Sequence, residues 1–138
     1  MDVAYIMAPF MGWLIPGSVK FAINCLRSGW LVWDQLGLGG LPNNHTAVVS
    51  STAGLIGLRE GVNTPLFAIA VTLAMIVTFD ALYLRREVGA QAAALNELLR
   101  GDATRPPLRE HLGHRQVEVL MGCLVGFGCA WLLHAVFP

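Results

Sequence analysis

The sequence predicts an all-α integral membrane protein, a single domain over residues 1–138 that forms a bundle of about four transmembrane helices. Hydrophobic residues make up 55% of the chain and charged residues only 13%, whereas charged residues are roughly a quarter of a typical soluble domain. The apolar residues gather in segments close to the length of about 20 residues that crosses a bilayer core. The formal net charge is zero, which gives no electrostatic basis for a nucleic-acid partner.

Four segments are predicted to form the membrane helices. The first covers residues 3–26, and the second, which is short, covers residues 45–58. The third, PLFAIAVTLAMIVTFDALYL, is the most continuous apolar segment, and its leading Pro65 suits the first turn of a helix. The fourth covers residues 117–137.

Two segments are predicted to lie outside the hydrocarbon core. Residues 85–100 carry apolar side chains at helical spacing, so this helical extension either continues the third helix out of the membrane or lies at the interface. The stretch SGWLVWDQLGLGG, residues 28–40, is too short to span. Its Trp30 and Trp33 are typical of an interfacial segment at the depth of the headgroups.

The basic residues predict the orientation in the membrane. With four spans, Arg59 is alone on one side of the bilayer. The positive-inside rule makes the other, more basic side cytoplasmic and leaves both termini outside, in a bacterial inner membrane or its equivalent. The residues on the basic side are Lys20, Arg27, Arg85, Arg86, Arg100, Arg105, Arg109 and Arg115.

Ionisable side chains interrupt the apolar segments near the cytoplasmic face. Such residues are costly in a bilayer and usually functional. Lys20 and Arg27 are seven residues apart, so they share one face of the first helix. His114 and Glu118 are four apart and lie one above the other. The residues predicted to meet at this face are Lys20, Arg27, His45, Asp80, His114 and Glu118.

These residue types suit phosphate chemistry. Lysine and arginine clamp a multiply charged anion, one histidine can attack phosphorus while a carboxylate orients its ring, and a second can protonate the leaving oxygen. Backbone N–H groups at the start of the second helix complement phosphate oxygens. No metal or other cofactor is expected. Taken singly, Lys20 and Arg27 also fit as snorkelling anchors, Asp80 as an ion-pair partner of Arg85 or Arg86, and His45 as a polar helix start.

Three motifs together resemble the divergent branch of the type 2 phosphatidic acid phosphatase superfamily, integral membrane relatives of the vanadium-dependent haloperoxidases. A GGMPSSHSA-like stretch reads GGLPNNHTA here, at residues 39–47. The stretch FDALYLRREVGAQAAALN, residues 79–96, follows the second pattern, and LGHRQVEVLMG, residues 112–122, follows the third. The wider superfamily signature is matched by KFAINCLR, by PNNH, and by HRQVE, in which Glu118 replaces the usual aspartate.

The resemblance implies a role for each matching residue. His114 would be the nucleophile that forms a phosphohistidine, Glu118 would orient it, and His45 would be the general acid. The third arginine of the site is Arg85 or Arg86, with Arg109 as the nearby alternative, and Asp80 is a supporting residue. The residues implied to bind phosphate are Lys20, Arg27, Asn43, Asn44, Arg85 and Arg86.

The implied function is metal-independent hydrolysis of a lipid phosphomonoester or pyrophosphate, with phosphatidylglycerophosphate as one substrate. The chain departs from the family pattern at Asn43 and Asn44, which replace serine and a small residue. An amide still donates a hydrogen bond to a phosphate oxygen, but a bulkier side chain can also fill the site, so this departure concerns activity rather than fold. The alternative is a non-catalytic membrane subunit or lipid-phosphate-binding protein that retains the anion site. Homo-oligomerisation is left open.

Overall fold

The computed structural model describes residues 3–28, 42–99, 106–110, 113 and 115–137. Its regular elements are all helical, and the described residues include no β-strand. The predicted interfacial segment falls almost wholly on residues 29–41, outside the described part. The helices are α1 (Val3–Ser28), α2 (Asn44–Arg59), α3 (Pro65–Phe79), a π-helical turn (Asp80–Leu84), α4 (Arg85–Leu98) and α5 (Gln116–Val136).

Three helical stretches are long and apolar enough to cross a membrane: Val3–Leu26, Pro65–Leu98 and Gln116–Val136. The fourth helix of the bundle, α2, has 16 residues. At a rise of 1.5 Å per residue it is about 24 Å long, shorter than a hydrocarbon core of about 30 Å. The prediction of a membrane helical bundle is confirmed, with the short second helix packed among three longer ones.

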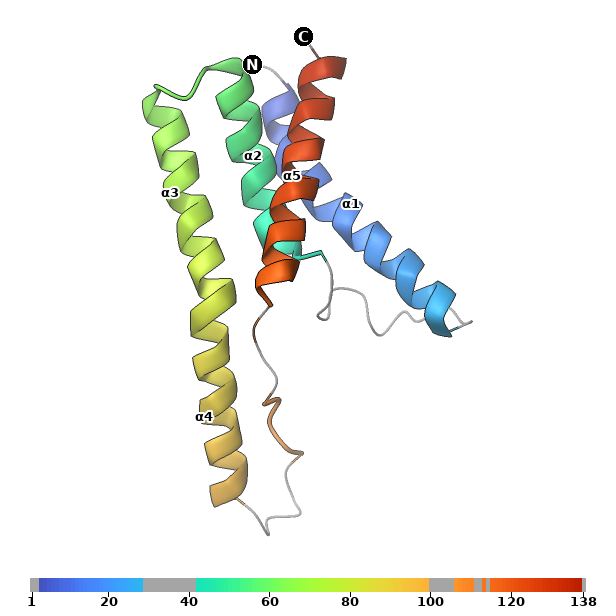
Figure 1. The fold of residues 1–138 in the computed structure, drawn as a ribbon, viewed down its shortest axis with the longest axis vertical. Coiled ribbons are helices and arrows are strands. Elements are labelled where there is room, and N and C mark those ends of the chain that lie inside the picture. Colours follow the sequence, from blue (N-terminus) through green and yellow to red (C-terminus); the bar gives the residue numbers. More distant parts are fainter. Residues whose placement is uncertain (1–2, 29–41, 100–105, 111–112, 114, 138) are drawn as a thin grey trace.

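The short helix α2 lies at the centre of the bundle. It packs against α5, α1 and α3, and α1 also packs against α5. Figure 1 shows both chain termini at one end, together with the connection between α2 and α3, while the C-terminal part of α1 diverges from the other helices. Lipid-facing backbone at this depth would need internal hydrogen bonds, and the surrounding helices enclose α2 within protein.

The first helix meets the bundle through a stripe of small residues. Ala4, Ala8, Gly12 and Pro16 recur at intervals of four and are all buried. Because residues four apart share a helix face, the stripe lets the two backbones approach closely, as small residues do between membrane helices. The Ser51 hydroxyl of α2 donates to the Ala8 carbonyl across this contact, at 2.8 Å.

Glycines on both sides of α2 allow the closest approaches. A Cβ atom built on Gly126 of α5 would lie 2.5 Å from the Ala47 carbonyl oxygen, and one built on Gly12 of α1 would lie 2.7 Å from the same atom. A Cβ on Gly122 would lie 2.6 Å from the Asn43 carbonyl oxygen. No side chain fits at these distances, so α2 touches its neighbours backbone to backbone.

Polar contacts tie the helices together at the end that holds the termini. The Tyr5 hydroxyl of α1 donates to Glu60 at the end of α2. The Arg59 guanidinium lies 5.5 Å from the centroid of the Tyr5 ring and donates to the Phe137 carbonyl after α5. These contacts give Arg59 structural partners at this end of the bundle.

The third helix continues past the membrane-spanning length. Residues Pro65–Leu98 form one unbroken helical stretch of 34 residues, about 51 Å long at 1.5 Å per residue. Of the two alternatives for residues 85–100, the structure therefore shows continuation of the third helix. The π turn within it, where the Arg85 N–H reaches the Asp80 carbonyl, was not predicted.

We expect Gly126→Ala to destabilise the bundle, because the added methyl group would force α5 away from the Ala47 carbonyl of α2. Overpacking of this kind costs about 1–3 kcal/mol, measurable as a lower unfolding midpoint in detergent. The matched control is Gly128→Ala, whose Cβ would meet nothing within 4 Å and which should leave the midpoint unchanged or slightly higher. Equal effects of the two substitutions would contradict this account of the packing.

Candidate functional site

The buried stripe of α1 ends in a lysine. Lys20 follows Pro16 at the same interval of four, and only 7% of its surface is exposed. Lysine is almost never buried this deeply without an opposite charge, and the charge of Glu118, in the first turn of α5, acts on its ammonium group. The packing of small residues thus positions a cation at the end of the bundle opposite the termini.

The fully buried Asn43 connects the start of α2 with α5. As the N-cap of α2, its Oδ1 accepts hydrogen bonds from the His45 N–H (3.0 Å) and the Thr46 N–H (3.4 Å). Its own N–H donates to the Glu118 carbonyl at 3.0 Å. The expectation that the first N–H groups of this helix serve phosphate needs correction, because the Asn43 side chain already occupies two of them.

Three buried polar atoms in the first turn of α2 have no hydrogen-bond partner within the described part of the chain. They are Asn43 Nδ2, Asn44 Oδ1 and Thr46 Oγ1. A buried polar group without a partner costs about 1–3 kcal/mol, so such a cluster needs an explanation, and a bound polar ligand is one. The Asn44 amide lies beside α1, where a Cβ on Gly17 would come within 3.7 Å of Nδ2.

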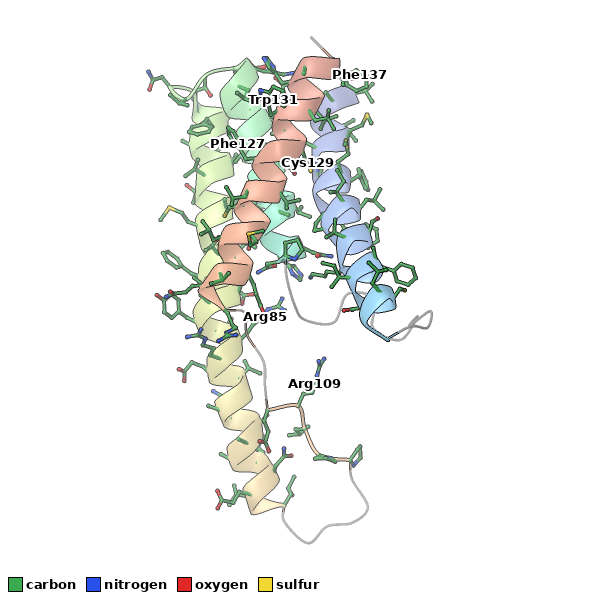
Figure 2. The ribbon with its side chains drawn as sticks, turned by 45° about the vertical axis from the view of Figure 1, so that its right-hand side comes forward. Arg85, Arg109, Phe127, Cys129, Trp131 and Phe137 are labelled. Atoms are coloured by element: carbon green, nitrogen blue, oxygen red, sulfur yellow. The ribbon has the colours of Figure 1, made fainter. Side chains whose placement is uncertain are left out.

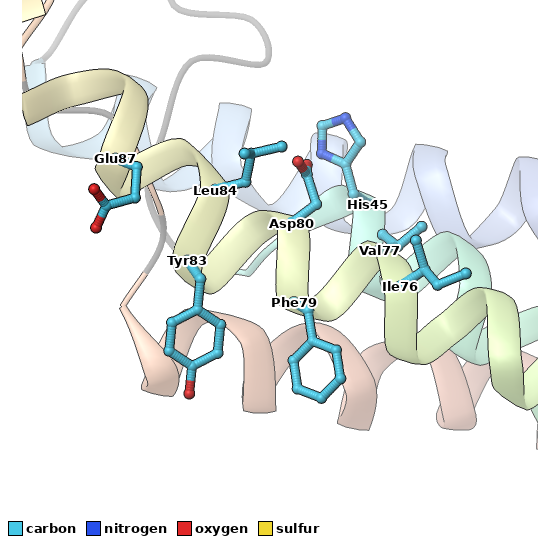
Figure 3. A pocket seen from close by; sticks show the side chains of 8 residues that line it. All are labelled: His45, Ile76, Val77, Phe79, Asp80, Tyr83, Leu84 and Glu87. Carbon is cyan, nitrogen blue, oxygen red and sulfur yellow. The ribbon is translucent and has the colours of Figure 1, made fainter. Parts of the chain in front are cut away.

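The catalytic candidate His45 lies at the edge of an open pocket beside α3. Its side chain is exposed, and it lines a cavity of about 710 Å³ together with Asp80 and apolar residues of α3 and the π turn. Figure 3 shows the His45 imidazole and the Asp80 carboxylate on the same side of α3. The structure therefore brings these two predicted residues to one pocket from two helices.

Asp80 and Arg85 form an ion pair at the π turn. The Arg85 Nε and Asp80 Oδ2 atoms are 3.4 Å apart, and both side chains are about two-fifths exposed. This is the ion-pair alternative noted from the sequence for Asp80. Because exposed pairs are weak, typically worth about 0–1 kcal/mol, Arg85 can exchange this partner for another anion at little cost.

The segment that leads to His114 contacts the start of α4. Gly113 has φ +102°, a left-handed conformation that favours glycine, and a Cβ there would lie 2.8 Å from Arg86 Cγ. His114 itself lies outside the described residues, between Gly113 and Arg115. Gly113 itself lies beside Arg85 and Arg86.

Glu118 begins α5 as part of its own helix cap. The Arg115 N–H donates to Glu118 Oε2 at 3.2 Å, and the Glu118 N–H donates to the Arg115 carbonyl at 2.9 Å. The carboxylate is thereby held at the backbone of Arg115, the residue that follows His114 in the sequence. One oxygen serves the helix start, as in a capping box.

One predicted arginine, Arg109, lies apart from this group. Arg109 is exposed, in a segment that Asn96 holds against α4 by two hydrogen bonds with the backbone of Leu108, each 2.8 Å. Asn96 follows Arg85 by 11 residues, about 16 Å along a helix, and Figure 2 shows Arg109 well beyond Arg85. Arg27 lies in the last turn of α1, and its side chain is outside the described part.

The described residues include no group of three or more histidine, cysteine, aspartate or glutamate side chains that could hold a metal ion.

Comparison with known proteins agrees with the motifs: residues 1–129 match the family described as the divergent PAP2 family. The chain belongs to this family. It is 30% identical, over 125 aligned residues covering 78% of this chain and 79% of the relative, to the uncharacterized membrane protein YuiD of Bacillus subtilis (strain 168). No solved structure matches it significantly.

Two features of this divergent PAP2 protein were missed from the sequence. Thr46 has a fully buried hydroxyl with no partner in the described part of the chain. Its position directly after His45 in the motif could have indicated that it belongs to the site. The π turn has no comparable signal, because its residues DALYL are compatible with an ordinary α-helix. Gly122 closes the third motif, and the contact of its backbone with Asn43 gives it a structural reason.

We expect Asn43→Ala to destabilise the protein by about 0.5–2 kcal/mol, the usual cost of losing an N-cap. Asn43→Ser should recover much of this loss, because a serine hydroxyl also accepts from the first-turn N–H groups of α2. The measurement is the unfolding midpoint of both variants in the same detergent. Since the two side chains differ by a single oxygen, equal midpoints would show that capping by residue 43 does not stabilise the fold.

Proposed function

We propose that this protein is a membrane lipid phosphatase that hydrolyses a phosphomonoester or pyrophosphate lipid through a phosphohistidine. The observation that carries the proposal is the buried Lys20, together with two buried donors in the first turn of α2, Asn43 Nδ2 and the Thr46 hydroxyl, that have no partner within the described residues. Burying a cation and unpaired donors costs free energy, and a bound phosphate offsets it. Membership of the divergent PAP2 family supports the same class of ligand.

Asn43 performs two tasks in this proposal. Its Oδ1 caps α2, while its Nδ2 is buried without a partner in the described chain and donates to a phosphate oxygen. A serine hydroxyl, the residue usual at this place in the family pattern, likewise both accepts and donates. The replacement by asparagine therefore retains the chemistry that the site needs.

The reaction proceeds in two steps. The His114 imidazole attacks phosphorus, the bond from phosphorus to the lipid oxygen breaks, and His45 gives its proton to that oxygen. Water then attacks the phosphohistidine, His45 takes back a proton, and inorganic phosphate leaves. Glu118 orients His114 and balances the charge of its ring. Lys20, Arg27 and Arg85 or Arg86 stabilise the charge on the phosphoryl oxygens.

The arginine of the site is Arg85 or Arg86 rather than Arg109. Gly113, adjacent to His114, lies against Arg86, whereas the segment that carries Arg109 is bound to Asn96. The proposal puts the site at the cytoplasmic face, because Arg59 lies at the bundle end that holds the termini, whereas Lys20, Arg85 and Arg86, among the described basic residues, lie toward the other end (Figure 1). Phosphatidylglycerophosphate is one substrate that suits such a location.

One observation favours a second candidate, a non-catalytic lipid-phosphate-binding protein. Some polar groups of the proposed site already have structural partners, since the Glu118 carboxylate caps α5 and the Asn43 Oδ1 atom caps α2. Such a protein would bind lipid phosphates without releasing phosphate. Turnover by the purified protein distinguishes the two functions.

We expect phosphate release from a lipid phosphate to persist in EDTA and to be blocked by vanadate. The proposed site stabilises charge with cations and hydrogen-bond donors instead of a metal ion, and vanadate imitates the trigonal bipyramidal phosphoryl group of the transition state. The measurement is phosphate release in detergent micelles with and without each reagent. Activity that EDTA abolishes and magnesium restores would indicate a different mechanism.

The two histidines should respond differently to substitution. His114→Ala should abolish both turnover and the acid-labile phosphoenzyme. His45→Ala should slow a lipid alkoxide leaving group by about 10²–10⁴-fold, the usual contribution of general acid catalysis. It should partly spare a nitrophenolate, which needs little protonation. A phosphohistidine that persists in His114→Ala and disappears in His45→Ala would reverse the two roles.

A further inference from the structure

We propose that the pocket beside His45 binds an acyl chain of the lipid substrate, whose phosphate occupies the proposed site at Lys20 and the first turn of α2. The proposal rests on the proposed function for the identity of the phosphate, and it adds a subsite that selects lipid over soluble phosphate esters. The pocket of about 710 Å³ runs along α3 and the π turn. This volume lies within the range of roughly 300–1,000 Å³ that is usual for small-ligand sites.

The pocket has two apolar rims on the outside of the bundle. Figure 3 shows Ile76, Val77 and Leu84 on the side of α3 that faces His45, and Phe79 and Tyr83 projecting from the other side. The two aromatic rings have centroids 6.1 Å apart. Because α3 belongs to a predominantly exposed membrane-spanning stretch, the pocket opens to lipid, and an apolar chain enters it from the bilayer.

The exposed lining of the pocket is almost wholly apolar, which suits a hydrocarbon chain. His45, Asp80 and Glu87 border it on the side toward α4. From Ile76 to Glu87 is 11 residues, about 16 Å along a helix, with the apolar end deeper in the membrane-spanning stretch. A lipid of the leaflet at this end therefore lies with its tail toward Ile76 and its polar part toward His45.

The charges of the pocket determine where the phosphate lies. The Asp80 and Glu87 carboxylates would repel a phosphate placed between them, although Arg85 partly balances Asp80 at 3.4 Å. The phosphate must therefore lie beyond His45, toward Lys20, which leaves the apolar pocket to the chain.

The π turn gives this arrangement its geometry. Its wider turn brings the Arg85 N–H to the Asp80 carbonyl, five residues back. The extra residue rotates the side chains that follow relative to those of α3, and π turns occur frequently at functional sites. It thereby sets the direction of Leu84 and Glu87 relative to Ile76 and Val77 along the pocket.

Photo-crosslinking tests the site without requiring turnover. The protein is reconstituted in phosphatidylcholine vesicles with phosphatidic acid that carries a diazirine on one acyl chain, and labelled peptides are mapped. We expect phosphatidic acid to label residues 76–84 several-fold more than it labels residues 66–73, earlier in the same helix. Phosphatidylcholine carrying the same diazirine chain should label both stretches alike, since it only surrounds the protein.

Two matched variants add a functional readout. Ile76→Trp fills the pocket from a side chain that is 61% exposed, and Leu73→Trp makes the same change at a 54% exposed position outside it. We expect only Ile76→Trp to lower phosphatidic acid labelling of residues 76–84 and kcat/KM for a long-chain lipid phosphate. Its kcat/KM for a short, soluble phosphomonoester should fall less than its kcat/KM for the long-chain lipid phosphate, and Leu73→Trp should leave both values at the wild-type level.

The outcomes separate this proposal from the proposed function. Selective labelling by phosphatidic acid in a protein that releases no phosphate would leave the chain site standing and exclude phosphatase activity. An active phosphatase in which both lipids label residues 76–84 alike would overturn the chain site only. The same conclusion would follow if Ile76→Trp and Leu73→Trp had equal effects on the long-chain substrate.

Discussion

Backbone contact between α2 and its two neighbours is the constraint on which the rest of the structure depends. The Ala47 carbonyl lies between Gly12 of α1 and Gly126 of α5, with no room for a side chain on either glycine. Such contacts occur only where small residues recur at helical spacing. Along α1 the small residues recur every four positions, and Lys20 is the next position of this series. On α5 the small residues at the contact follow Glu118. Packing and charge placement are therefore two consequences of one repeat.

This constraint explains how a polar helix start is tolerated in a membrane protein. The first N–H groups of a helix have no intrahelical partner, and exposing them to hydrocarbon would be costly. Here α1 and α5 surround the first turn of α2, while Asn43 caps it from inside and bonds to the Glu118 carbonyl. The three unpartnered polar atoms that remain lie in an enclosed, low-dielectric setting. There a phosphate would interact more strongly with Lys20 than it would in water.

The sequence predicted the helices well because bilayer thickness and apolar content together determine their lengths. The motifs predicted that His45 and Asp80 meet near one end of the bundle, in agreement with the pocket that both line, while the roles of the motif residues stay predictions. The role of Asn43 as a cap could not be predicted, because an asparagine beside a helix start can either cap it or bind a ligand, and only the fold decides between them. The π turn was equally inaccessible, since its residues favour an α-helix and neighbouring packing determines the extra residue. His114 stays a prediction, outside the described residues.

The central claim is that the polar residues at the end of the small-residue stripes form one phosphate site. A crystal structure of the protein with bound vanadate tests it most directly. The account predicts vanadium bonded to the His114 imidazole, with the Lys20 ammonium and Asn43 Nδ2 within hydrogen-bond distance of its oxygens and His45 at the apical oxygen. Vanadate bound instead beside Arg109 and Asn96, with Lys20 and Asn43 making no contact to it, would contradict the account.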